Sequence, residues 1–302
     1  MKIMDKSPFD PVTLSKIAGM ELRARQVVDG ILSGIHKSPY QGSSIEFLEH
    51  KEYSPGSEIK HIDWKVHARS DKYYVKQFEE ETNLKCYLFL DTSGSMGYQS
   101  AGVSKYEYAS NLVASLSYLL LKQSDLVGLI NFRDKVLQYV PPRSRIVHLR
   151  VLLNALVGFK TAGKSDVAAA LGEFEGKIGR RSLIIIVSDF FDDVEKVIRQ
   201  IKHFQSRKSE IILFQILDPY ELTFPFETIT YFESLEDDRR VLADPKSIKE
   251  HYLAGINRFI EQFKQSCYEN RIEYQLINTA TPLDQVLVNF LAKRKGSSSL
   301  KG

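Results

Sequence analysis

Oxygen-bearing side chains alternate along residues 91–96, which read Asp-Thr-Ser-Gly-Ser-Met. Asp91, Ser93 and Ser95 stand at positions i, i+2 and i+4, so in a turn their oxygens can converge on one point. Hydroxyl and carboxylate oxygens are hard ligands, and they suit Mg²⁺, which prefers octahedral oxygen coordination and keeps several waters. This stretch therefore predicts a site for a divalent cation.

A second aspartate follows another strand-like run. Residues 183–187 are Leu-Ile-Ile-Ile-Val, and Ser188 and Asp189 come directly after them. Residues 84–90, before Asp91, are also rich in aromatic and aliphatic side chains, so both runs predict buried strands. If the two strands are neighbours, Asp91 and Asp189 stand side by side at the carboxyl edge of the sheet, where open α/β sheets bind their ligands.

The loop at residues 161–166 offers a third set of oxygens. Ser165 is the first candidate ligand in it, Thr161 is the substitute candidate, and Asp166 is a weaker one. Ser93 and Ser165 could instead serve only as helix caps, which is the commonest use of such residues. The choice between capping and metal binding stays open at Ser165, and so does the choice between Ser165 and Thr161.

An alternation of strands and helices predicts the scaffold that positions these groups. We expect strands at residues 85–90, 126–132, 136–140, 182–188 and 210–217, and helices at 105–122, 145–157, 166–178 and 194–205. A hairpin at 228–233 and 239–242, a long helix opened by Asp244-Pro245, a strand at 271–277 and a helix opened by Thr281-Pro282 follow. This pattern is typical of an α/β fold with a doubly wound, mostly parallel sheet and helices on both faces.

The sequence predicts five parts in order along the chain. They are an N-terminal helix at 1–35, a charged β-rich elaboration packed on the core at 36–82, the main α/β domain at 83–220, a hairpin-helix extension that completes the fold at 221–293, and a tail at 294–302. The tail is rich in Lys, Gly and Ser, and chain ends of this kind fray, so we expect it to be flexible.

The composition of the 302 residues limits the possible functions. Hydrophobic residues make up 43% and charged residues 26%, which allows a sizeable core. A formal net charge of +3 is too small to argue for nucleic acid, which needs a clustered basic face. No secretory signal precedes Pro11, and no run approaches the roughly 18 apolar residues of a membrane span. We expect a cytoplasmic protein without a membrane span, with Cys86 and Cys267 as reduced core thiols.

The order of these motifs is similar to a known family pattern. A DxSxS motif that starts at Asp91, a later hydroxyl loop and then an aspartate closing a strand resemble the metal-ion-dependent adhesion site of von Willebrand factor type A domains. The resemblance implies their Rossmann-like fold for residues 83–220, with the DxSxS residues in the first metal loop and Asp189 in the third. The family usually has Thr followed by Asp in the second loop, whereas this chain has Ser165-Asp166.

Segments outside the core narrow this resemblance to one family of unknown function, usually paired with MoxR-type AAA+ ATPases, over roughly residues 36–290. The matching segments are Glu46-Phe47, Tyr53-Ser54-Pro55-Gly56, Ile62-Asp63-Trp64-Lys65, Ala68-Arg69, residues 75–81, residues 187–190 and Asp244-Pro245. The resemblance implies a non-enzymatic adaptor that works with a MoxR-type AAA+ ATPase in chaperone-like maturation or remodelling of client proteins.

The chemistry of such a site favours binding over catalysis. Neutral hydroxyls as direct ligands leave the charge of Mg²⁺ or Mn²⁺ poorly compensated, so an Asp or Glu of a partner protein is attracted to the vacant position. A phosphatase of the aspartyl-phosphate type would need a second carboxylate two residues after Asp91, where Ser93 stands. We therefore expect a metal-dependent binding protein that has no catalytic residues.

One rival motif overlaps the middle loop. Residues 158–165 match the P-loop pattern GxxxxGK[ST], which cradles phosphates, and Asp189 could then act as a Walker B carboxylate. A P-loop requires a strand directly before its first glycine, whereas the leucines of residues 149–157 follow helical spacing. Nucleotide binding or hydrolysis through Gly158 to Ser165 is therefore the alternative hypothesis.

Overall fold

The computed structural model describes residues 11–36, 51–52, 74–75, 84–100, 102–237 and 239–298. The chain divides into two units, one made of residues 1–32 and 83–302 and the other of residues 33–82. In the second unit, past helix α1 (Pro11–His36), the described residues form two short strands, β1 (Lys51–Glu52) and β2 (Tyr74–Val75), which pair antiparallel. The rest of the predicted β-rich segment lies outside the described residues, as do residues 299–302 and the family-like segments at 46–47, 53–56, 62–65, 68–69 and 76–81.

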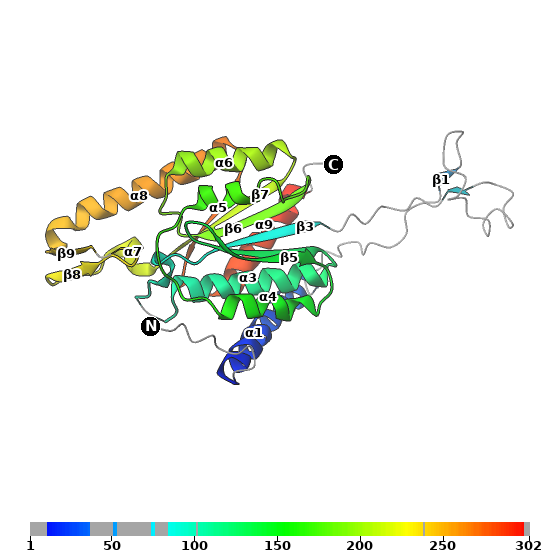
Figure 1. Ribbon diagram of the computed structural model, residues 1–302, viewed down its shortest axis with the longest axis horizontal. Coiled ribbons are helices and arrows are strands. Elements are labelled where there is room, and N and C mark those ends of the chain that lie inside the picture. Colours follow the sequence, from blue (N-terminus) through cyan, green and yellow to red (C-terminus); the bar gives the residue numbers. More distant parts are fainter. Residues whose placement is uncertain are drawn as a thin grey trace. The chain divides into compact units, whose positions relative to one another are not determined.

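A six-stranded sheet forms the centre of the first unit (Figure 1). Its strands are β3 (Lys85–Asp91), β4 (Leu126–Phe132), β5 (Val136–Arg143), β6 (Ser182–Ser188), β7 (Glu210–Leu217) and β10 (Glu273–Asn278). Their order across the sheet is β10-β7-β6-β3-β4-β5, and all neighbours are parallel except β4 and β5. The predicted α/β fold with a mostly parallel sheet is therefore confirmed.

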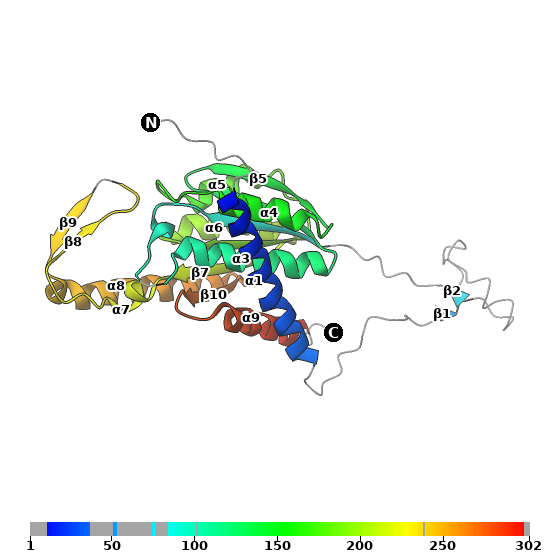
Figure 2. The ribbon, with the colours of Figure 1, turned by 90° about the horizontal axis from the view of Figure 1, so that it is seen from below.

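Helices cover both faces of this sheet. They are α3 (Lys105–Lys122), α4 (His148–Val157), α5 (Val167–Phe174), α6 (Val194–Ser206), α7 (Pro219–Thr223), α8 (Pro245–Glu269) and α9 (Leu283–Ser298), with a short 3₁₀ turn, η2 (Ser95–Gly97). Figure 1 shows α5, α6 and α8 on one face of the sheet. Figure 2 shows the opposite face, where α1 crosses α3. None of the described helices is long and apolar enough to cross a membrane.

The core follows from the two-residue alternation of side chains along each strand. Tyr87 and Phe89 of β3 point to the face of α5, α6 and α8, where Phe89 packs edge-to-face on Phe174 with ring centroids 5.8 Å apart. On the other face, Phe214 of β7 packs on Phe290 of α9 at 5.3 Å. Because β3 is buried on both faces, its carboxyl end is held in place by two layers of packed side chains.

Several element bounds differ from the sequence prediction. Strand β5 continues to Arg143 through two prolines, which an edge strand tolerates because its outer N–H groups need no partner. Helix α5 ends at Phe174 instead of residue 178, since glycines at 176 and 179 weaken helix formation there. Helix α9 reaches Ser298, past the predicted start of the tail at residue 294. The predicted hairpin is present as β8 (Thr230–Glu233) and β9 (Arg240–Ala243).

The chain order across the sheet creates a topological switch point at its carboxyl edge. From β3 the chain runs through α3 to β4 and β5 on one side, and β6, β7 and β10 are added on the other side. The direction of winding therefore reverses between β3 and β6. Ligands of open α/β sheets bind outside the carboxyl ends of the strands at such a switch point.

Both cysteines lie in this packed interior. Cys86 of β3 and Cys267 of α8 are free thiols with buried side chains. Burial raises the pKa of each thiol above its ordinary value. The predicted core position of both cysteines is confirmed.

Candidate metal centre

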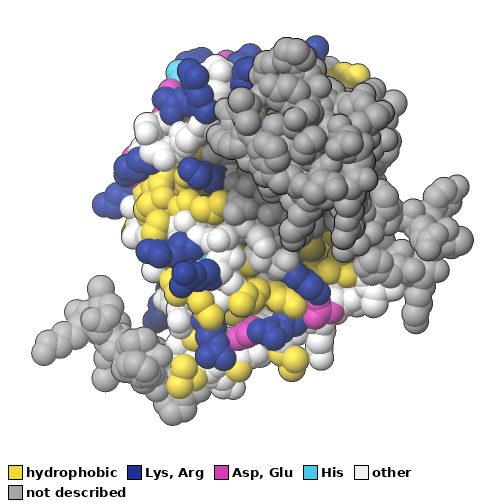
Figure 3. Space-filling model, turned by 90° about the vertical axis from the view of Figure 1, so that its right-hand side faces the viewer, with side chains coloured by type: hydrophobic (Ala, Val, Ile, Leu, Met, Phe, Trp, Pro, Cys, Tyr) yellow, Lys and Arg dark blue, Asp and Glu magenta, His cyan; other side chains and the backbone are white. Residues whose placement is uncertain are grey.

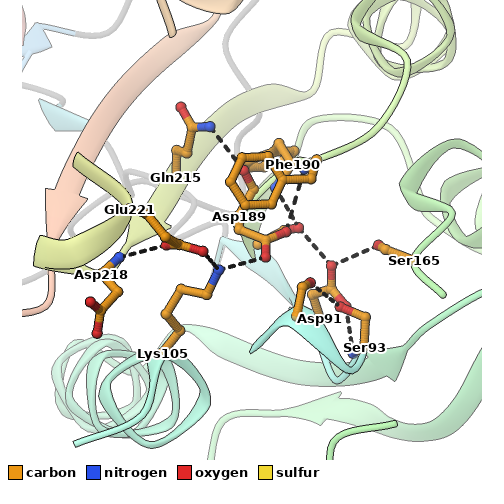
Figure 4. Close-up of polar contacts among 12 residues, drawn as sticks. Asp91, Ser93, Lys105, Ser165, Asp189, Phe190, Gln215, Asp218 and Glu221 are labelled. Carbon is orange, nitrogen blue, oxygen red and sulfur yellow. Dashed lines mark hydrogen bonds and ion pairs between the residues drawn. The ribbon is translucent and has the colours of Figure 1, made fainter. Parts of the chain in front are cut away.

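The switch point brings three predicted loops together around Asp91 (Figure 4). Because β3 and β6 are parallel neighbours, Asp91 and Ser188 leave the sheet at the same edge. Ser188 Oγ donates a hydrogen bond to Asp91 Oδ2 at 2.6 Å, and Ser165 Oγ donates to the same oxygen at 2.7 Å. Residues 74 and 97 positions away in the sequence thus meet at one carboxylate.

Asp91 itself is a fully buried carboxyl group whose hydrogen-bond donors are all neutral. Its other oxygen, Oδ1, accepts the backbone N–H of Ser93 at 2.8 Å. Burial and the nearby charge of Asp189 raise the pKa of Asp91 to about 6, although its hydrogen bonds, first among them that of Ser188, lower it. A carboxylate that is costly to ionise, with only neutral donors around it, is stabilised by a bound cation.

The two serines of the DxSxS motif stand side by side in the loop after β3. Ser93 Oγ and Ser95 Oγ lie 3.1 Å apart. Two adjacent ligands of an octahedral Mg²⁺, each at about 2.1 Å, are about 3.0 Å apart, so this spacing fits. The loop is tied to the middle loop by the Gly94 N–H, which donates to the Gly163 carbonyl at 2.8 Å.

The middle loop places its three candidates differently. Ser165 contacts Asp91 directly, as described, and does not cap the following helix. Asp166 is the N-cap of α5, where its carboxylate accepts the backbone N–H of Ala169 at 2.7 Å, so its side chain has a structural role. Thr161 lies against Gly97, where an added Cβ would come within 2.4 Å of Thr161 Oγ1. Of the three candidates, Ser165 is the one whose side chain is hydrogen-bonded to Asp91.

Asp189 is paired with a buried lysine that the sequence analysis did not single out. Lys105 Nζ lies 2.8 Å from Asp189 Oδ2 and 2.6 Å from Glu221 Oε1, and the side chains of Lys105 and Asp189 are completely buried. Burial disfavours the charged form of Lys105, but the two carboxylates outweigh it and raise the lysine pKa. The lysine therefore stays charged and neutralises part of the site.

Helix α7 holds Glu221 in position for this ion pair. Asp218 accepts the N–H of Tyr220 at 2.8 Å, and Glu221 Oε2 accepts the N–H of Asp218 at 2.7 Å, which together form a capping box. The other oxygen of Asp218 accepts the N–H of Ser100 at 2.9 Å. The sequence signal was an aspartate before a proline with a glutamate three residues on.

The residue after Asp189 carries backbone strain. Phe190 is fully buried and adopts φ 55°, which is uncommon for a bulky side chain. Its N–H donates to Ser188 Oγ at 2.9 Å, so the same hydroxyl that contacts Asp91 also fixes the turn. Strained residues of this kind cluster at functional sites, where the surrounding structure holds them in place.

Comparison with known proteins identifies the family. Residues 49–258 match the model of the family described as "Protein of unknown function DUF58". The chain belongs to the DUF58 family. The uncharacterized proteins Rv1480 of Mycobacterium tuberculosis and Mb1516 of Mycobacterium bovis are similar to it, each 26% identical over 219 residues, which is 72% of this chain and 68% of theirs.

Two solved structures resemble the DUF58 chain more distantly. The conserved hypothetical protein BatB from Bacteroides thetaiotaomicron has a TM-score of 0.45 and 16% identity, covering 70% of this chain and 98% of BatB. An aerotolerance-related membrane protein from Bacteroides fragilis has a TM-score of 0.43 and 15% identity, covering 67% of this chain and 94% of that one. Neither similarity identifies a function.

The donor set of the DUF58 chain fits a hard cation held mainly by hydroxyl groups. Among the described residues, no three or more His, Cys, Asp and Glu side chains gather as a metal-binding group. The converging donors are instead the hydroxyls of Ser93, Ser95 and Ser165 with the carboxylates of Asp91 and Asp189. Such a set suits Mg²⁺ or Mn²⁺ and not zinc, which prefers nitrogen and sulfur ligands.

The geometry of the middle loop differs from that of a P-loop. Helix α4 ends at Val157, directly before Gly158, in the place where a P-loop requires a strand. Helix α5 begins only at Val167, and the Lys164 ammonium lies 3.8 Å from the Asp237 carboxylate. The loop therefore does not lead from a strand straight into a helix, as phosphate cradles do.

Proposed function

We propose that this DUF58 chain is a non-enzymatic adaptor that binds a partner protein through Mg²⁺ or Mn²⁺ held by Asp91, Ser93, Ser95, Ser165 and Asp189. The observation that carries the proposal is the meeting of three loops at the buried Asp91 carboxylate: it accepts the Ser165 and Ser188 hydroxyls and the Ser93 N–H, and the Ser93 and Ser95 hydroxyls lie 3.1 Å apart in the same loop. When bound, the cation supplies a positive charge that attracts a carboxylate of the partner.

The chain's own charges favour an acidic ligand over catalysis. Lys105 neutralises one of the two carboxylates that it contacts, Asp189 and Glu221. The remaining direct donors around Asp91 are uncharged hydroxyls, so they compensate little of a dication's charge. An Asp or Glu side chain of a partner would supply the missing negative charge.

An exposed apolar surface on the hairpin supports a protein as the partner. Tyr231 of β8 and Leu242 of β9 lie directly across from each other and are both mostly exposed. Ile229, just before β8, is also exposed. Neighbouring exposed apolar side chains of this kind are typical of contact surfaces, because water solvates them poorly.

The motif pattern supports a more specific proposal for the fold of the core and for the partner. The order of the loops along the chain and their meeting at the ends of β3 and β6 support a von Willebrand factor A-like core in residues 83–220. Membership of DUF58 and the resemblance to the family paired with MoxR-type AAA+ ATPases support such an ATPase as the working partner. We propose that the two act together in chaperone-like maturation or remodelling of client proteins, in the cytoplasm.

Capture of partners with and without the cation tests this function. Wild type, Asp91→Ala and Asp134→Ala are used as baits in Mg²⁺ or in EDTA, and bound proteins are identified by mass spectrometry. Asp134 is the matched control, an exposed acidic residue in the turn between β4 and β5. We expect wild type and Asp134→Ala to retain an AAA+ ATPase or a client in Mg²⁺ only, and Asp91→Ala to retain neither. Equal capture in EDTA would contradict the proposal.

A further inference from the structure

The turn between β8 and β9 lies against the proposed cation site. A Cβ added to Gly94 would come within 1.9 Å of the carbonyl oxygen of Leu235, so the turn rests directly on the DxSxS loop. Gly94 has ordinary right-handed dihedral angles, φ −59° and ψ −41°. The close approach of Leu235, and not backbone strain, is therefore what leaves no room for a side chain at this position.

Glu236 extends from this turn to the site itself. The Cα of Glu236 lies 3.3 Å from the position of a Cβ added to Gly94, and the neighbouring Ser95, one of the proposed cation ligands, lowers the pKa of the Glu236 carboxyl group. Partial burial raises the pKa of Glu236, and the charges of Asp189 and Lys105 also act on it. The Glu236 carboxyl group thus lies within electrostatic reach of the same groups that surround Asp91.

A second contact ties the turn to the middle loop. The Asp237 carboxylate lies 3.8 Å from Lys164 Nζ, and Lys164 is the neighbour of Ser165. Asp237 is itself held by Arg239, whose Nε lies 3.0 and 2.9 Å from its two oxygens. The turn therefore spans from the first loop of the site to the second, with Glu236 between these two contacts.

We infer that Glu236 is an internal ligand of the cation and occupies the position that an Asp or Glu of the partner takes on binding. This inference rests on the proposed function, because it requires a cation at Asp91. A carboxylate on the same chain has an effective concentration on the order of millimolar, so it outcompetes a weak free carboxylate. A partner must then supply further contacts to displace the turn, which makes binding selective.

The contacts that hold the turn are suited to such an exchange. The ion pair between Lys164 and Asp237 is long, and the lysine side chain is largely exposed, so water screens it. The apolar pair of Tyr231 and Leu242 stands on the same hairpin. A partner that packs on Tyr231 and Leu242 would contact the same hairpin whose turn carries Glu236, and could displace that turn from the cation.

Manganese affinity of variants tests the assignment. Free Mn²⁺ is measured by electron paramagnetic resonance during titration of wild type, Glu236→Gln, Asp91→Ala and Glu227→Gln. Glu227 is the matched control, an exposed glutamate shortly before β8. Loss of a carboxylate ligand is expected to weaken Mn²⁺ binding by Glu236→Gln about tenfold or more, with Glu227→Gln unchanged. Unchanged or tighter binding by Glu236→Gln overturns the inference.

Rescue of Mn²⁺ affinity by acetate distinguishes a ligand role of Glu236 from a merely structural one, because acetate cannot replace a structural contact. Acetate well above millimolar concentration should fill the vacated position and restore Mn²⁺ affinity in Glu236→Gln, with little effect on wild type. Absence of rescue in Glu236→Gln overturns the inference and leaves the proposed function standing. Failure of wild type to bind Mn²⁺, or equal binding by Asp91→Ala, overturns the proposed function together with the inference.

Discussion

The two edges of the central sheet carry charge in opposite ways. At the carboxyl edge, Asp91, Lys105, Asp189 and Asp218 are completely buried and bonded to other groups. At the amino edge, strand ends and loops carry exposed cations beside the exposed Glu210: Lys85, Arg143, Arg145, Arg180, Arg181, Lys208 and Arg271. Figure 3 views the side of the molecule where β3 begins in Figure 1, and Lys and Arg side chains are much more prominent there than Asp and Glu.

The turns at the amino edge only reverse the chain, whereas those at the carboxyl edge also bury charged side chains. Ser124, Arg181, Lys208 and Arg271 all adopt φ between 54° and 65°, and each stands one or two residues before a parallel strand. This left-handed position reverses the chain after a helix, and the side chains point to water. Burying charged side chains costs much more free energy than forming such an exposed turn. The buried charge network at the carboxyl edge is therefore typical of a functional site.

Removal of Lys105 is expected to have the largest effect on stability. The change Lys105→Met leaves Asp189 and Glu221 without their cation in a buried place, which should cost about 3–5 kcal/mol of unfolding free energy. The control Lys122→Met breaks the exposed pair with Asp29, which water screens, and should cost far less. Urea denaturation in EDTA measures both, and similar losses would refute the buried role of Lys105.

Neutralising Asp91 is expected to stabilise the cation-free chain in a pH-dependent way. Its pKa is raised from 3.8 to about 6, so the folded chain binds the proton more tightly and ionisation costs stability as pH rises from about 4 to about 6. In EDTA, Asp91→Asn should therefore gain up to about 3 kcal/mol near pH 7.5 and almost nothing near pH 4. A gain of the same size at both pH values would exclude this cause, and excess Mg²⁺ should reverse the sign.

Substitutions to and from glycine at left-handed positions should affect Mn²⁺ binding at the carboxyl edge but not at the amino edge. Gly163 has φ 73°, so Gly163→Ala should cost about 1 kcal/mol, and it should also weaken Mn²⁺ binding because the Gly163 carbonyl holds the DxSxS loop. Lys208 has φ 61°, and Lys208→Gly should be neutral or stabilise by less than about 1 kcal/mol, with no effect on Mn²⁺. Thermal denaturation and Mn²⁺ titration measure both, and weaker Mn²⁺ binding by Lys208→Gly would argue against independent edges.

His148 should give the smallest effect and the opposite pH dependence. Its Nε2 lies 3.0 Å from the Val127 carbonyl near the amino edge, and burial lowers the pKa of His148 below its ordinary 6.5. Stability from the neutral ring is thus present above pH 6.5 and is lost as the pH falls through the lowered pKa. We expect His148→Gln to lose less stability than wild type on acidification, as measured by urea denaturation. An equal loss would show that His148 does not titrate in this range.

Much of the fold could be predicted from the sequence because its core elements are long and strongly patterned. Strands β4, β6 and β7 and helix α3 have the predicted bounds, since their apolar runs stop at polar turn residues. Helix α7 was not predicted, because five residues are too few to show a helical period. Only its capping residues, Asp218 and Glu221, carried a signal in the sequence.

The proposed ligands of the candidate site could be predicted from the sequence, but the buried ion pairs beside them could not. The sequence indicated Asp91 and its serines by spacing, and the adjacency of β3 and β6 confirms the expected meeting of the two loops. Lys105 was missed because it begins an apolar helix and reads as a surface lysine. A cation at a helix N-terminus is disfavoured by the helix dipole. The position of Lys105 in the first turn of α3 was therefore the sequence feature that could have indicated an acidic partner. Its partner Glu221 lies 116 residues away in the sequence, which no local pattern reveals.

The buried cysteines have a practical consequence. The sequence has two cysteines, Cys86 and Cys267, and both are buried with raised thiol pKa values. A thiol reacts as its thiolate, so neither should be labelled by maleimide in the folded chain. Val241 is exposed on the hairpin, and Val241→Cys would provide a single reactive thiol without replacing either native cysteine. A fluorophore attached there would follow the hairpin in real time as the cation and a partner are added.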